Sequence, residues 1–79
     1  MKAHGYVKKQ VTPTGLYEMS EVTFSGSSTS IRQIAQFLLA AADEMDRRGL
    51  QFSHTHIGEQ FSDWNERWPD IIVARASRD

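Results

Sequence analysis

Two histidines flank a threonine in the segment Phe52-Ser-His-Thr-His-Ile57, and they are the first candidates for chemistry in this sequence. Alternate side chains of a strand point to the same side, so we expect His54 and His56 to share one face. Two imidazoles and a carboxylate can hold a transition metal, and we assign Asp70 as the third ligand, with two nearby alternatives: Glu59 and Asp63. In a simpler interpretation both rings lie on a half-exposed sheet face, hydrogen-bonded to neighbours or to Asp70, and no cofactor is needed.

An acidic segment with two tryptophans follows in the polar connection at residues 58–69. Tryptophans in such a connection either close a small core or anchor a partner protein, and the sequence leaves both roles open. Four carboxylates between residues 59 and 70 stand against a single arginine, Arg67, which favours docking onto a basic surface. The contact surface predicted for a protein partner comprises Asp63, Trp64, Glu66, Trp68 and Asp70.

Composition argues against several other classes of function. Nine Lys+Arg balance ten Asp+Glu, for a net charge of −1, which disfavours a nucleic-acid partner. The chain has no cysteine, which excludes thiolate metal sites and predicts a reducing compartment. No apolar run approaches the roughly 20 residues that span a bilayer, so we expect no membrane partner. Neither a G-x-S-x-G elbow nor a glycine-rich phosphate loop is present, and we expect a protein that is not an enzyme.

The elements that would position these residues begin with a β-hairpin, predicted with strands at residues 2–11 and 16–24 and a turn at 12–15. Apolar and polar residues alternate in both strands, but the alternation changes phase in the second. Met19 and Val22 consequently fall on opposite faces of a regular strand. A β-bulge near Ser20-Glu21 would bring them to the same face.

A helix is predicted over residues 30–48. Ser30 and Gln33 fit a capping box at its start, and Gly49 suits the left-handed position after its end. Apolar residues at three- and four-residue spacing form a stripe that should face the core: Ile31, Ile34, Ala35, Leu38, Ala42 and Met45. The acidic residues near the end of the helix are expected to form a solvated face: Asp43, Glu44 and Asp46.

Two further strands are predicted at residues 52–57 and 70–76, with a helical turn at residues 63–66 before Pro69. The order β-β-α-β-β predicts one α+β domain over residues 1–79, with a frayed tail at residues 77–79. The helix should cover one face of a four-stranded, mostly antiparallel sheet. The other face then needs a cover, which the 58–69 connection, a second copy in a homodimer, or a different protein could supply.

Four parts of the sequence together resemble a family of small bacterial immunity proteins from polymorphic toxin systems. They are the hairpin, residues 31–45, the His54-Thr-His56 segment and Trp68-Pro-Asp-Ile-Ile-Val73, and the resemblance spans residues 3–75. It implies an α+β fold, a cytoplasmic location and neutralisation of a cognate toxin by binding. It also draws attention to Asp70 in the Pro-Asp-Ile motif.

Overall fold

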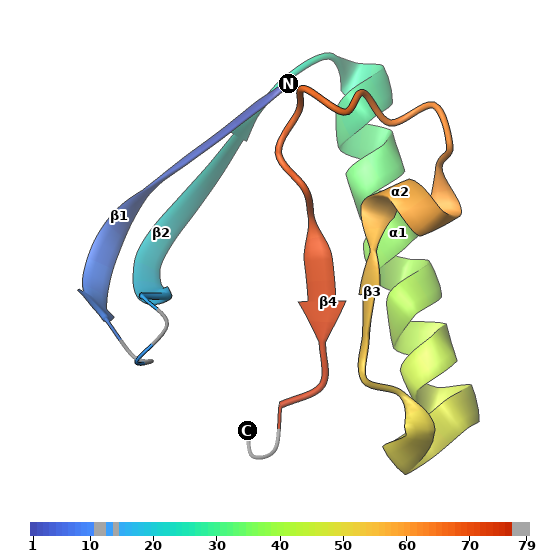
Figure 1. Cartoon of the computed structure of the whole chain (residues 1–79). Helices are drawn as coiled ribbons and strands as arrows, with labels where there is room; N and C mark the ends of the chain where they lie inside the picture. Colours follow the sequence, from blue (N-terminus) through green and yellow to red (C-terminus); the bar gives the residue numbers. More distant parts are fainter. Residues whose placement is uncertain (11–12, 14, 77–79) are drawn as a thin grey trace.

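The computed structural model describes residues 1–10, 13 and 15–76 of this α+β protein (Figure 1). The elements in chain order are β1 (Lys2–Gln10), β2 (Tyr17–Ser25), α1 (Ser28–Arg48), a 3₁₀ turn η1 (Gly49–Gln51), β3 (His54–His56), α2 (Ile57–Gln60) and β4 (Ile72–Ala74). Gly15 adopts a φ of 91°, as its place in the predicted turn requires. The rest of that turn's centre and the predicted frayed tail fall on residues 11–12, 14 and 77–79, outside the described residues.

The hairpin of β1 and β2 contains the predicted bulge. Tyr6 pairs with Glu21 and the next residue, Val7, pairs with Met19, so Ser20 is the extra residue. The Ser20 hydroxyl donates a hydrogen bond to the Tyr6 carbonyl at 3.1 Å. The bulge places Met19 on the same side of the hairpin as Gly5. The Met19 methyl lies 2.5 Å from the position that a Cβ on Gly5 would take.

Helix α1 ends as predicted but begins earlier. Gly49 has a φ of 58°, and its N–H bonds to the Met45 carbonyl. The predicted N-cap at Ser30 is wrong, because the Ser27 hydroxyl accepts from the Ser30 N–H and α1 starts at Ser28. Ser30 is buried, and its own hydroxyl donates to the Ser27 carbonyl at 2.9 Å. Several serines in this segment can cap, and the local sequence does not distinguish them.

The prediction of a single four-stranded sheet is wrong. Strands β1 and β2 pair with each other, and β3 pairs antiparallel with β4 in a separate two-stranded sheet. Only Gly26 and Ser27 separate β2 from α1, so the hairpin leaves the N-terminal end of the helix and diverges from β4 (Figure 1). Both later strands are also shorter than predicted, and Ile57, expected in a strand, begins α2.

The helical turn expected at residues 63–66 is also misplaced. The short helix α2 lies earlier, and residues 61–71 form a turn-rich connection between α2 and β4. Two of its backbone hydrogen bonds are local, from the Trp64 N–H to the Phe61 carbonyl at 3.0 Å and from the Trp68 N–H to the Asn65 carbonyl at 2.9 Å. The connection therefore folds as two successive turns.

A small core lies between α1 and the sheet of β3 and β4. Its centre is Ile34, Phe37 and Ile57, and residues packed against it are Met1, Phe61, Trp64, Ile71 and Val73. Phe52 and Ala41 are also buried. The helix therefore buries the face that carries Ser30, Ile34, Phe37 and Ala41.

The predicted core stripe of α1 is correct only in part. Ile34 is buried, but Ile31 is 39% exposed and Leu38 is 45% exposed. Their neighbours one turn away, Ala35 and Ala42, are also exposed. Helix α1 thus has a second apolar line, beside its buried face, that the described part of the chain leaves uncovered.

Candidate functional site

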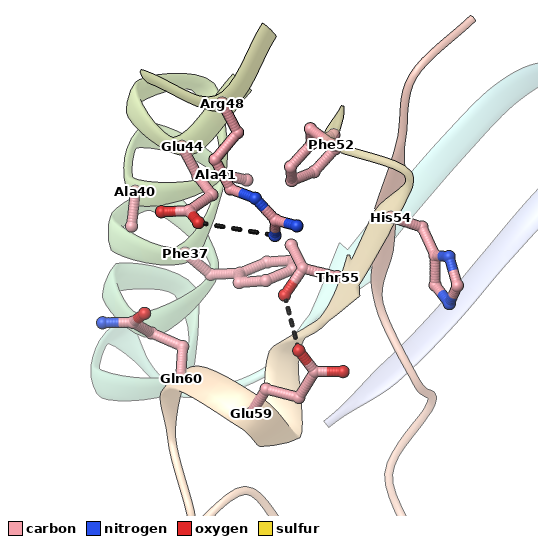
Figure 2. Close-up of a pocket in the computed structure, with 10 residues that line it drawn as sticks. All are labelled: Phe37, Ala40, Ala41, Glu44, Arg48, Phe52, His54, Thr55, Glu59 and Gln60. Atoms are coloured by element: carbon pink, nitrogen blue, oxygen red, sulfur yellow. Dashed lines mark hydrogen bonds and ion pairs between the residues drawn. The ribbon is translucent and has the colours of Figure 1, made fainter. Parts of the chain in front are cut away.

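The histidines lie on the outer face of the β3–β4 sheet. Cross-strand partners share a face, and Thr55 pairs with Val73, which packs against the core. His54 and His56, on either side of Thr55, therefore point away from α1, and Figure 2 shows His54 on the opposite side of β3 from the helix.

Hydrogen bonds fix both imidazole rings. The His56 Nδ1 lies 2.6 Å from the Asp70 Oδ2, and the His54 Nδ1 lies 3.1 Å from the Ser53 hydroxyl. The two rings meet edge to face with centroids 5.2 Å apart. His54 and His56 thus lie side by side, as the alternation of the strand predicts, and Asp70 is hydrogen-bonded to His56.

The other carboxylates considered as metal ligands lie elsewhere. Glu59 accepts from the Thr55 hydroxyl at 3.0 Å, and Asp63 accepts from the Gln33 amide at 3.4 Å. In the part of the chain that the structure describes, no group of three or more histidine, aspartate or glutamate side chains is placed to hold a metal ion. Of the three carboxylates, Asp70 is the one bonded to a histidine.

The two tryptophans form an edge-to-face pair at the end of the core. Trp64 is half-buried against the core cluster, and its indole N–H donates to the Pro69 carbonyl at 3.0 Å. Trp68 lies edge to face on Trp64, with ring centroids 4.9 Å apart. Trp64 therefore serves as a lid on the core, and Trp68 lies farther out on that lid.

The carboxylates of the same connection point to solvent. Asp63, Glu66 and Asp70 are exposed, while Trp68 of the same connection is half-buried. The Asn65 side chain accepts from the Arg67 N–H at 2.8 Å, which holds the second turn in place. We call Asp63, Glu66, Trp68 and Asp70 the acidic loop surface. These are the residues predicted to contact a partner, apart from Trp64, which lies beneath them.

A shallow cleft between α1 and β3 was not foreseen from the sequence. It has a volume of about 150 Å³, and its lining includes Glu44, Arg48, Phe52, Thr55 and Glu59 (Figure 2). The alternation in β3 could have indicated this cleft. Because His54 and His56 share one face, Thr55 between them must lie on the other face, toward the helix.

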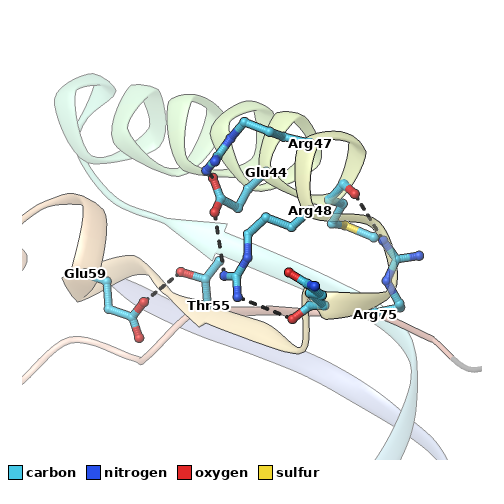
Figure 3. Close-up of polar contacts among 8 residues, drawn as sticks. Glu44, Arg47, Arg48, Thr55, Glu59 and Arg75 are labelled. Atoms are coloured by element: carbon cyan, nitrogen blue, oxygen red, sulfur yellow. Dashed lines mark hydrogen bonds and ion pairs between the residues drawn. The ribbon is translucent and has the colours of Figure 1, made fainter.

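Glu44 was expected in a solvated face and is instead half-buried beside this cleft. It bonds to Arg47 and lies 3.6 Å from an Arg48 nitrogen, and Arg48 also donates to the Gln51 carbonyl at 3.3 Å (Figure 3). Arg75 donates to the Met45 carbonyl at 3.2 Å. These contacts join the end of α1 to the segments around β3 and β4, which is a structural role.

No family model, curated protein or solved structure matches this chain significantly. Among the described residues, no helix has both the length and the apolar character that crossing a membrane requires.

Proposed function

We propose that this chain is a non-enzymatic protein-binding module that inhibits a cognate bacterial toxin by occupying the toxin's surface. The observation that carries the proposal is the acidic loop surface, in which Asp63, Glu66 and Asp70 are exposed on the same short connection as the half-buried Trp68. A connection that combines exposed carboxylates with an aromatic side chain is suited to a basic protein surface.

The platform beneath this surface supports the proposal. Trp64 ties the connection to the core and to the Pro69 carbonyl, while Gln33 and His56 hold Asp63 and Asp70 from α1 and β3. A surface held in place before binding loses less conformational entropy when a partner arrives. Inhibition would then need only steric and electrostatic occlusion of the toxin, with no turnover.

The compartment follows from the same proposal. An immunity-type inhibitor protects the cell that makes it, so it works in the cytoplasm, where a newly made or imported toxin would act. A chain without cysteine is suited to that reducing environment.

Co-expression with a toxin-like protein, sought in the reading frame directly upstream of this chain's gene, tests the proposal. Cells that produce the toxin should grow when the chain is present and stop when it is absent. The double variant Asp63→Lys/Glu66→Lys should lose protection, because it reverses the charge of the acidic loop surface. Glu21→Lys makes the same kind of change on β2, away from that surface, and should protect fully.

Growth that does not depend on the chain, or equal protection by the loop variant and the Glu21→Lys control, would contradict the proposal. Protein levels must be matched by immunoblot, so that lost protection reports on binding and not on abundance.

A further inference from the structure

The hairpin presents an apolar face that nothing in the described chain covers. Ala3 pairs with Phe24, Gly5 with Val22, and Val7 with Met19, and cross-strand partners share a face. We call Ala3, Val7, Met19, Val22 and Phe24 the hairpin face; Val22 and Val7 are 53% and 56% exposed. A two-stranded hairpin in water is marginally stable by itself and gains stability when a helix or more strands cover it.

Helix α1 presents the complementary surface. Ile31, Ala35, Leu38 and Ala42 recur at helical spacing, are all exposed, and form what we call the helix stripe. Neither strand of the hairpin packs extensively on α1 in the described structure. Each chain therefore carries a sheet face without a helix and a helix stripe without a sheet.

We infer that a second copy of this chain covers both surfaces, with the hairpin face of each copy packed on the helix stripe of the other. The two surfaces match in length. Ile31 to Ala42 spans about 16 Å at ~1.5 Å per residue, and Ala3 to Val7 spans about 13 Å at ~3.3 Å per residue. A helix on a sheet face is also the standard way for both elements to bury apolar side chains.

The charged side chains of the hairpin leave the hairpin face apolar. Lys2 pairs with Ser25 and Lys9 with Glu18, on the side of the hairpin opposite the hairpin face. Lys8 forms an ion pair with Glu18 of the same hairpin at 3.4 Å. The contact with the helix stripe of a second copy would therefore be apolar.

The symmetry of the arrangement supplies the area that a dimer needs. A twofold axis generates the hairpin-to-helix contact twice. Two faces of this size bury a total on the order of 1,000 Å², the threshold for a stable biological interface. The acidic loop surface is outside both contacts, so this inference does not depend on the proposed function.

Light scattering on the full chain gives the first test. The native protein should have twice the 9.0 kDa mass of the chain. Val22→Lys on the hairpin face and Leu38→Lys on the helix stripe should each give the mass of one chain. Two matched controls, Tyr6→Lys on the other face of the hairpin and Leu50→Lys after α1, should remain dimeric, although both side chains are highly exposed.

Mixing the two interface variants distinguishes this reciprocal hairpin-on-helix dimer from dimers that pack in other ways. A pair of Val22→Lys and Leu38→Lys chains retains one intact contact, between the hairpin of the second variant and the helix of the first. The mixture should therefore regain dimers that neither variant forms alone. Far-ultraviolet circular dichroism should show equal helix content in all variants, because the substituted side chains are exposed.

A native protein that stays monomeric at all concentrations overturns the inference. The same holds for a monomer whose hairpin face binds a different protein. A dimer that survives either interface variant, or a mixture that does not regain dimers, also overturns it. Should Val22→Lys alter the helix signal, Val7→Lys on β1 takes its place in the same mixing experiment.

Discussion

The acidic loop surface depends on single side chains that hold a short connection in place. Trp64 is the most important of these, since it packs on the core and donates to the Pro69 carbonyl. The sequence placed two tryptophans in a polar connection but did not separate their roles, because their spacing says nothing about which one meets the core. The geometry separates them: Trp64 lies on the core, and Trp68 lies on Trp64.

Trp64→Ala should therefore lower the free energy of unfolding by about 2 kcal/mol, the order expected for removing a half-buried aromatic side chain. Trp68→Ala should cost less, because its ring packs on Trp64. Urea denaturation followed by circular dichroism measures both. Equal losses for the two variants would contradict the assignment of Trp64 as the lid.

Gly5 is a residue at which the structure leaves no room for a larger side chain. A Cβ at this position would lie 2.3 Å from the Glu21 carbonyl oxygen, a backbone atom with little room to move. Gly5→Ala should therefore disrupt the register around the bulge, whereas Ala3→Gly on the same strand should leave the register unchanged. Amide chemical shifts of β1 and β2 report the outcome, and unchanged shifts in Gly5→Ala would refute the close approach.

At the scale of elements, the periodicity of the sequence predicted features within single elements better than it predicted which strands pair. The helix end at Gly49 and the bulge at Ser20 followed from left-handed glycine geometry and from a change in alternation. The helix start did not, because Ser27, Ser28 and Ser30 offer similar caps. The four-stranded sheet was wrong because alternation fixes which residues share a face and not which strand lies beside which.

The N-cap is a direct test at this scale. Ser27→Ala should destabilise α1 by about 1 kcal/mol, since it removes the hydroxyl that accepts from the Ser30 N–H. Ser28→Ala, at the next position, should have little effect. Thermal unfolding of the two variants distinguishes them, and a larger loss in Ser28→Ala would place the cap elsewhere.

For the whole molecule, the sequence anticipated that one helix would leave a sheet face uncovered. It did not show that the hairpin and α1 would each leave an apolar surface open. The apolar spacing of α1 predicts one broad buried face and does not indicate which part of that face is covered. Ile31 and Leu38 illustrate this limit, since their spacing fits the core and yet both are exposed. The adjacency of His54 and His56 could be predicted, because it depends only on alternation within one strand.

Calorimetric titration of the purified toxin with this chain tests the central claim most directly. The account predicts one-to-one binding per chain that weakens as salt increases, and a loss of about tenfold in affinity, or ~1.4 kcal/mol, for Glu66→Lys. Glu21→Lys should bind like the native chain. Binding that is unaffected by Glu66→Lys, or the absence of any binding heat, would contradict the account.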